Sequence, residues 1–212
     1  MPNTHGPVVY GLRGTFDGVW EANSHVDVEE AERLAVYRTN QGTDAHLVDA
    51  RVSEVRDGRS YRVEGKVVEE PDTLEGGHVF FEIEDDERLS CAAFEPTGRF
   101  RDTVRRLREG DRVVVCGSVS DGTLKVEKMR VVSLNRTRHV KPMCCGRRME
   151  SAGRRQSYRC RADDCDETAE TLVEERVERE IDEGWYEVPP SARRHLAKPL
   201  VRLRDPSRHE TV

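Results

Sequence analysis

The sequence predicts a mainly β, multidomain protein built of small modules rather than one large domain. Only 35% of its 212 residues are hydrophobic and 36% are charged, so apolar residues are too few for one large core. From residue 58 onward, short segments of alternating apolar and polar residues are separated by turn-forming residues, as is typical of strands. Four cysteines then fall in two close groups, which indicates a small metal-binding ribbon.

Residues 1–57 are predicted to form a small α/β segment. Two short apolar stretches, "PVVYGLRG" and "RLAVYRT", each end in a turn, and "SHVDVEEAERL" between them contains helix-compatible residues. Ser24 and Asp27 are candidate N-caps of that helix, because their side chains accept hydrogen bonds from free N–H groups at a helix start.

A polar loop, "YRTNQGTDAH", follows the second apolar stretch. Its side chains Asn40, Gln41, Thr43 and Asp44 offer oxygen and nitrogen atoms to a cation or a polar ligand. The same residues are also common in turns for purely local reasons. The spacing alone favours an ordinary loop over a binding site.

Residues 58–136 are predicted to form a five-stranded OB-fold barrel. Three strand segments, "YRVEGKVVEE", "HVFFEIED" and "RLSCAAFEP", precede an amphipathic helix in "GRFRDTVRRLREG". Two more strands, "DRVVVCGSVSDG" and "TLKVEKMRVVSL", are joined by a hairpin turn at Asp121 and Gly122. Three strands, a helix and two strands is the OB-fold order, and Gly65 and Gly117 stand where tightly curved strands need glycine.

The predicted barrel also carries aromatic residues and two of the six cysteines. Phe80, Phe81 and Phe94 are candidates for stacking on bases, because OB folds commonly bind oligonucleotides on an open face. Alternation along a strand buries every second residue, so only part of this set is available. Cys91 and Cys116 fall within strands and are expected to be buried apolar residues.

Residues 137–185 are predicted to form a zinc-ribbon-like module. Its candidate ligands are Cys144, Cys145, Cys160 and Cys165. The gaps within the two pairs are zero and four residues, whereas ribbons usually have two. In a reducing compartment, clustered cysteines indicate metal more often than disulfides. Zinc is therefore the expected cofactor, and the alternative is a metal-free remnant held by its small sheet.

Arginine is concentrated between the cysteine pairs, although the formal net charge of the chain is −6. Residues 136–161 contain nine arginines and lysines against a single acid, Glu150. Guanidinium groups pair with phosphates and stack on bases, whereas most charge runs are only solvated surface. The predicted nucleic-acid-binding residues of this island are Arg147, Arg148, Arg154, Arg155, Tyr158 and Arg159.

The end of the chain reads as two segments. "TAETLVEERVEREIDEG" fits a helix and, equally well, a strand in its first half, and residues 186–212 form a basic, proline-rich tail. In the tail, Arg193, Arg194 and Lys198 follow a rigid pair of prolines. They either contact phosphate or belong to a strut packed on another domain, and the sequence favours neither.

Composition also indicates where the protein works. Acidic residues outnumber basic ones and lysine occurs at only five positions, which suits the salt-rich cytoplasm of a halophilic organism. The sequence has no apolar run of membrane-spanning length and its first residues do not resemble a signal peptide, so a cytoplasmic protein without membrane contact is expected. No phosphate-binding loop, nucleophile elbow or zinc-protease helix is present, and no catalytic residue is assigned.

Five stretches in this order, "VVYGLRG", "YRTNQGTDAHL", "FEPTGRFRDTVRRL", "CGRRMESAG" and "YEVPPSARRHLAKPL", resemble the C-terminal half of the archaeal isoleucine tRNA 2-agmatinylcytidine synthetase family. The resemblance implies a ligase with a kinase-like ATP-using domain, a ferredoxin-like domain, an OB domain and a zinc ribbon. Such enzymes use ATP and magnesium to attach agmatine to the wobble cytidine of an isoleucine tRNA.

The resemblance makes residues 1–57 part of the ferredoxin-like domain, near the agmatine site. The residues that it implies for agmatine binding are Tyr10, Gly11, Arg38, Asn40, Gln41 and Asp44. In the ribbon, Cys145, Cys160 and Cys165 match family ligand positions, whereas the first position falls on Pro142 and Cys144 has to substitute.

The resemblance further implies that the catalytic domain is not in this chain. We therefore expect the chain to bind the isoleucine tRNA without modifying it, either together with a separate catalytic polypeptide or as a degenerate fragment. The alternative is a free-standing OB and zinc-ribbon protein that binds single-stranded nucleic acid in general, as replication and repair proteins do.

Overall fold

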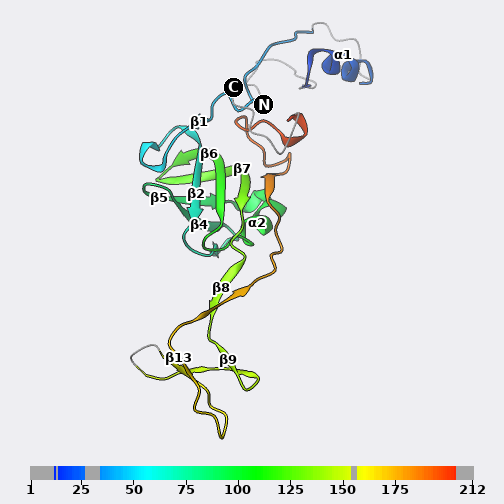
Figure 1. The fold of residues 1–212 in the computed structure, drawn as a ribbon. Helices are drawn as coiled ribbons and strands as arrows, with labels where there is room; N and C mark the ends of the chain where they lie inside the picture. Colours follow the sequence, from blue (N-terminus) through cyan, green and yellow to red (C-terminus); the bar gives the residue numbers. More distant parts are fainter. Residues whose placement is uncertain (1–11, 13, 27–33, 154–156, 204–212) are drawn as a thin grey trace. The chain divides into compact units, whose positions relative to one another are not determined.

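The structure is a computed structural model that describes residues 12, 14–26, 34–153 and 157–203. The chain divides into two units, Met1–Thr39 and Asn40–Val212. Figure 1 shows the strands of the second unit in cyan through orange. No helix among these described residues is long and apolar enough to cross a membrane.

The first unit contains helix α1 (Phe16–Ser24). It begins at an N-cap, Thr15, whose hydroxyl oxygen accepts a hydrogen bond from the N–H of Gly18 at 3.2 Å. Ser24 is therefore the last residue of a helix and not its N-cap, so that prediction was wrong. The other candidate, Asp27, lies outside the described residues.

The second unit is built around a closed barrel of five strands (Figure 1). These strands are β2 (Ser60–Val67), β4 (Val79–Glu84), β5 (Arg88–Ala93), β6 (Arg112–Ser120) and β7 (Thr123–Ser133). Strand β2 pairs antiparallel with both β4 and β6, and β5 pairs parallel with β7, which closes the barrel. Helix α2 (Arg99–Val104) lies between β5 and β6 in the chain. The predicted OB-fold order is confirmed.

The barrel interior is filled by the inward half of each strand, and fully buried examples are Val63, Ile83, Val115, Leu124 and Met129. Burial also raises the pKa of the Cys91 thiol, and it raises the pKa of Cys116 to about 11. Both thiols are buried and uncharged at neutral pH, as expected for small apolar residues in strands.

Gly117 is required by a close approach of two backbones. A Cβ at this position would lie 2.0 Å from the carbonyl oxygen of Lys125, well inside van der Waals contact. The pairing of β6 with β7 also shifts register between Cys116 and Gly117, as in a β-bulge. The prediction that strand curvature needs glycine here is confirmed.

Shorter elements extend the barrel sheet. Strand β1 (Val48–Asp49) pairs parallel with β2, β3 (Asp72–Thr73) pairs with β4, and β15 (Gly184–Glu187) pairs antiparallel with β7. Three short 3-10 helices complete the unit: Val52–Glu54, Glu95–Thr97 and Leu200–Arg202. Strand β15 comes after the cysteines in sequence, so the chain returns to the barrel from the ribbon segment.

The ribbon segment consists of short paired strands. Strand β8 (Thr137–Val140) pairs antiparallel with β14 (Val173–Arg176), and β9 (Met143–Cys144) pairs with β10 (Arg147–Arg148). A three-stranded sheet joins β11 (Glu150–Ser151), β12 (Tyr158–Arg159) and β13 (Thr168–Ala169). Of the two readings of residues 168–184, the strand in the first half is confirmed, because β14 forms there and pairs with β8, and the helix is wrong.

Candidate metal centre and nucleic-acid interface

The four ribbon cysteines lie together. Their Sγ atoms are all within 4.8 Å of one another, and Cys144 Sγ lies 3.9 Å from Cys145 Sγ and 3.6 Å from Cys165 Sγ. A tetrahedron of sulfur atoms around zinc, with bonds of about 2.3 Å, has edges of about 3.8 Å. The donor set therefore fits one tetrahedral ion of the kind that thiolates prefer.

The turn between β9 and β10 explains how two adjacent cysteines reach one point. Cys145 has a φ of 47° and Gly146 a φ of 74°, both in the left-handed region that non-glycine residues rarely adopt. Consecutive side chains of an extended strand point to opposite faces. The left-handed Cys145 ends the strand and brings its thiol to the same side as that of Cys144.

Hydrogen bonds around the thiols favour different protonation states. The N–H of Ala162 donates to Cys160 Sγ at 3.4 Å, and this bond lowers the pKa of Cys160. Hydrogen bonding to Cys165, followed by that to Cys160, raises the pKa of Cys144 to about 12. Without a cation the cluster cannot hold four thiolates, whereas a bound metal ion replaces their protons.

The predicted basic residues of the ribbon differ in how they are held. Arg148 pairs with Glu175, with Nη2 2.7 Å from the carboxylate, and donates to the carbonyl of Lys141. Arg147 on β10 and Arg159 on β12 are exposed and form no ion pair within the described part of the chain. Tyr158 is half-buried in the central strand of its sheet. Arg154 and Arg155 lie outside the described residues.

The tail packs on the barrel sheet. Leu196 and Ala197 are buried, and Arg193 forms an ion pair with Glu187 at 2.8 Å. Arg194 is half exposed, with its Nε 3.8 Å from Glu127. The tail therefore packs on another part of the protein, which is one of the two alternatives that the sequence left open. The Arg194 guanidinium still reaches solvent.

The polar loop is tied to this tail. The N–H of Gly42 donates to the carbonyl of His195 at 2.5 Å, and the N–H of Asp44 donates to that of Leu196 at 3.2 Å. Asn40 and Gln41 are exposed at the start of the loop. Arg38 belongs to the first unit, and Tyr10 and Gly11 lie outside the described residues.

Asp44 itself is engaged by the protein. Its carboxylate accepts hydrogen bonds from Lys128 Nζ and, at 2.6 Å, from the N–H of Lys198, and Arg62 lies 3.7 Å away. Lys128 is 1% exposed and its ammonium also lies 5.3 Å from the centre of the Trp185 ring. We did not predict Lys128 as a site residue. The sequence feature that could have indicated it is a lysine placed among the apolar residues of a strand, in a chain with few lysines.

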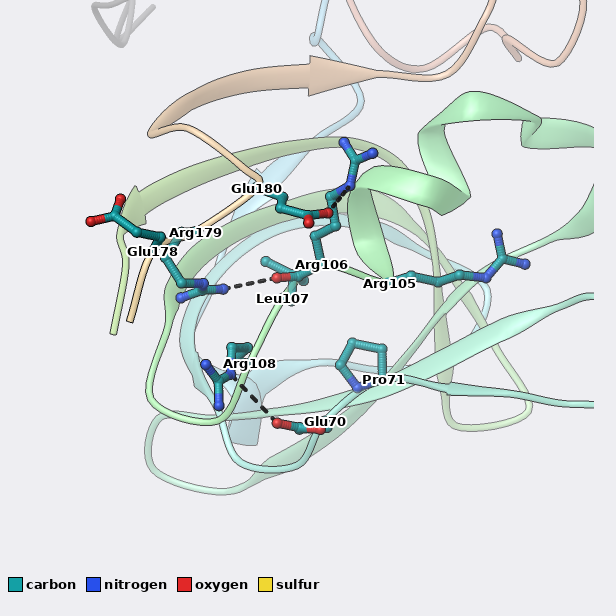
Figure 2. Close-up of a pocket in the computed structure, with 9 residues that line it drawn as sticks. All are labelled: Glu70, Pro71, Arg105, Arg106, Leu107, Arg108, Glu178, Arg179 and Glu180. Atoms are coloured by element: carbon teal, nitrogen blue, oxygen red, sulfur yellow. Dashed lines mark hydrogen bonds and ion pairs between the residues drawn. The ribbon is translucent and has the colours of Figure 1, made fainter. Parts of the chain in front are cut away.

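A hollow near the end of α2 gathers four arginines, shown in Figure 2. Arg105 pairs with Asp102, Arg106 with Glu180 and Arg108 with Glu70. The lining residues are Glu70, Pro71, Arg105, Arg106, Leu107, Arg108, Glu178, Arg179 and Glu180. Arg179 is held by the buried Asp111. Since each of these cations has an acidic partner, the hollow offers little net charge to an anion.

Two family models match the chain. The TiaS FLD domain model matches residues 1–46, and the TiaS C-terminal zinc ribbon domain model matches residues 141–181. The second match contains all four clustered cysteines.

Relatives and solved structures agree with these matches. The chain is 47% identical to isoleucine-tRNA 2-agmatinylcytidine synthetase TiaS of Archaeoglobus fulgidus and 49% identical to that of Methanosarcina acetivorans. These alignments cover 99% and 97% of this chain but 51% and 49% of the relatives.

A crystal structure of apo TiaS superposes with a TM-score of 0.75 at 46% identity, covering all of this chain and 52% of that one. A TiaS complex with its isoleucine tRNA and ATP superposes at 0.73 and 46% identity, over 91% of this chain and 46% of that one. The chain thus spans about half the length of the relatives it matches.

Proposed function

The chain is homologous to about half of the isoleucine-tRNA 2-agmatinylcytidine synthetases, and from this we propose that it is the tRNA-binding portion of such a ligase. In this role it holds an isoleucine tRNA while agmatine is attached to the wobble cytidine. The observation that carries the proposal is the order of modules, in which a match to the FLD domain, an OB barrel and a zinc ribbon follow one another.

The ribbon supplies the phosphate contacts. Arg147 and Arg159 are exposed without acidic partners in the described part of the chain, so their guanidinium groups are available to phosphate. The pair of Arg148 with Glu175 is exposed, and exposed pairs contribute about 0–1 kcal/mol. A phosphate can therefore replace Glu175 at little cost.

Zinc is the proposed cofactor of this part. Cys144, Cys145, Cys160 and Cys165 would hold it, and binding would stabilise the turns that carry Arg147 and Arg159. The ion is structural, because four protein thiolates leave no open position for a substrate.

Agmatine binding is proposed for the exposed start of the polar loop. Asn40 and Gln41 offer amide oxygens to the cationic ends of agmatine, with Arg38, Tyr10 and Gly11 as further members of the family motif. Asp44 fixes the loop instead of binding agmatine, because its carboxylate is already engaged by Lys128 and Lys198.

ATP and magnesium belong to the catalytic part of the ligase. We propose that the ligase works in the cytoplasm of a halophilic archaeon. The acidic composition supports that habitat.

A salt titration of tRNA binding tests this function. The variant with Arg147, Arg148, Arg154 and Arg155 all changed to Ser is expected to bind an isoleucine tRNA more weakly. Its slope of log K against log salt should fall by about 0.7–0.9 for each phosphate that the variant no longer neutralises. A control changes three exposed arginines outside the ribbon to Ser, namely Arg51, Arg88 and Arg112.

Two results would contradict the proposal. Equal binding by the ribbon variant and the wild-type chain removes the ribbon from the interface. A preference for an unstructured oligonucleotide over the folded tRNA favours the free-standing single-strand binder instead.

A further inference from the structure

The outer face of β4, β5 and β7 carries an aromatic cluster that the ribbon contacts do not explain. Phe80 on β4, Ala92 on β5 and Lys125 on β7 are direct neighbours in adjacent strands. Phe94 follows the end of β5 and lies next to Phe80. Phe81 points into the core and is 3% exposed, whereas Phe80 and Phe94 are partly exposed. Strand alternation has thus divided the phenylalanines as expected.

Edge-to-face contacts hold the rings of this cluster. The Phe94 ring centre lies 5.1 Å from that of His78, at an interplanar angle of 69°, and 6.3 Å from that of Phe80, at 76°. Such T-shaped pairs are a preferred aromatic geometry. The N–H of Glu95 donates to His78 Nδ1 at 3.0 Å, so a neutral His78 ring carries its proton on Nε2 and can donate from there. The rings are oriented before any ligand arrives.

The small Ala92 gives the cluster its shape. Its side chain is fully buried between the neighbouring Phe80 and Lys125. A larger residue there would separate the ring of Phe80 from the lysine. The face therefore combines aromatic surface and one cation within the width of three strands, about 10 Å.

Lys125 supplies the charge of this face. Its ammonium lies 5.7 Å from the Phe94 ring centre and forms no ion pair with any residue that the structure describes. The neighbouring acids are paired with arginines: Glu82 with Arg88 at 3.6 Å and Glu95 with Arg101 at 3.5 Å. Lys125 therefore stays available for an anionic group beside an aromatic surface.

We propose that Phe80, Phe94 and His78, together with Lys125, form a stacking platform for an unpaired nucleobase of the bound RNA. The proposal rests on the proposed tRNA-binding function and adds a second contact on the barrel. Aromatic rings stack on any base whose face is free, and Lys125 is placed to contact the phosphate of the same nucleotide. Bases within a duplex have both faces covered by their neighbours, so the platform selects single-stranded parts of a folded RNA.

The position of the platform agrees with the topology. Strands β4 and β5 are the second and third strands of the barrel, and OB folds bind oligonucleotides on the face of these two strands. An aromatic surface alone would also suit an apolar protein partner. The Lys125 ammonium beside the rings has no ion pair in the described part of the chain, which favours a ligand that carries both an aromatic face and a negative charge.

The test measures binding of an isoleucine tRNA transcript, and of a single-stranded RNA 12-mer labelled with 2-aminopurine, at several salt concentrations. The Phe80→Leu/Phe94→Leu variant keeps the volume nearly constant but removes the rings. It is expected to bind both RNAs about 5- to 150-fold more weakly for each base that stacks. The slope of log K against log salt should stay unchanged, because every phosphate-binding side chain is kept. The Phe80→Leu/Phe94→Trp variant, which returns one ring to the platform, should recover binding and quench 2-aminopurine.

Phe16→Leu is the matched control, since Phe16 is an aromatic residue that is 65% exposed in the other unit. Thermal unfolding of each variant reports whether it is folded. Wild-type affinity in a folded Phe80→Leu/Phe94→Leu variant overturns the platform. An equally weak affinity in the Phe80→Leu/Phe94→Trp variant also overturns it. If the wild-type chain binds no tRNA, the proposed function fails as well. If binding depends on the ribbon arginines but not on Phe80 and Phe94, only the platform fails.

Discussion

The ammonium of Lys128 lies 2.6 Å from one carboxylate oxygen of Asp44 and 2.8 Å from the other, although the residues are 84 positions apart in the chain. The same ammonium lies 3.4 Å from the carbonyl oxygen of Lys198. One buried cation therefore joins the polar loop, strand β7 and the C-terminal tail. This contact makes the tail part of the structure that positions Asn40 and Gln41.

Removing that cation should destabilise the second unit. Lys128→Met leaves the Asp44 carboxylate half-buried without its main partner, and breaking a buried pair in this way costs about 3–5 kcal/mol. Urea unfolding measures the loss. Lys66→Met is the control, because Lys66 is an exposed lysine of the same barrel and should change stability by less than about 0.5 kcal/mol. Similar losses in the two variants would contradict this role of Lys128.

Arg179 and Asp111 should behave as one unit. Asp111 is fully buried, and Arg179 Nη1 lies 2.6 Å from its Oδ1. Arg179 also donates to the carbonyls of Asn135 and Arg106. Arg179→Met and Asp111→Asn are each expected to cost about 3–5 kcal/mol. The double variant should cost less than the sum of the two by about 1–3 kcal/mol, measured as a double-mutant cycle of unfolding free energies. Additive losses would show that the residues are not coupled.

Glu127 should give stability a specific dependence on pH. Burial raises the pKa of this carboxyl, and the nearby Arg194 only partly offsets the effect. Between the ordinary pKa and the raised one, the folded state binds more protons than the unfolded state, so stability falls as pH rises. Glu127→Gln should remove this fall and be more stable than wild type at neutral pH, with little difference below pH 4. Thermal unfolding from pH 4 to pH 8 measures the difference in stability between Glu127→Gln and wild type. The control Glu69→Gln, which changes an exposed glutamate, should have the same pH dependence as wild type.

Cys144 should be needed for the metal despite its unusual spacing. The wild-type chain is expected to bind about one zinc ion, and Cys144→Ser should bind well below that amount, because one thiolate of four is lost. Elemental analysis after dialysis gives the metal content. Cys116→Ala, which changes a buried cysteine of the barrel, should keep the ion. Full metal content in Cys144→Ser would exclude Cys144 from the site.

Gly117 should tolerate no side chain. In Gly117→Ala the new Cβ meets the carbonyl of Lys125, so the two strands must separate, at a cost near the upper end of about 1–3 kcal/mol. The midpoint of urea unfolding reports the change. Gly14→Ala should stay within about 0.5 kcal/mol of wild type, since its nearest contact is an ordinary 3.7 Å. A neutral Gly117→Ala would mean that the strands adjust freely at this point.

The barrel was predictable because its signals are local. Alternation marked each strand, and Gly117 and the turn at Asp121 and Gly122 stand at positions that the backbone geometry requires. Helix α1 was not predicted: it begins after the N-cap Thr15 and ends at Ser24. Most of the segment that was expected to be helical, residues 24–34, lies outside the described residues.

The contacts that define the candidate site were not predictable in the same way. The pairs of Asp44 with Lys128 and of Asp111 with Arg179 join residues far apart in sequence, and no spacing rule relates them. The cysteine cluster was predicted from residue type, but its completeness depends on the left-handed turn at Cys145. Arginine density marked the ribbon, yet only the structure distinguishes Arg148, which pairs with Glu175, from Arg147, which has no ion pair among the described residues.

Thr137 and Arg176 lie opposite one another in β8 and β14. The residues between them therefore leave and rejoin the rest of the chain at one place, and β15 then completes the barrel sheet. The ribbon is thus a segment whose two ends already meet at paired strands. Such a segment can be lengthened, exchanged or removed while the order of the barrel strands stays the same.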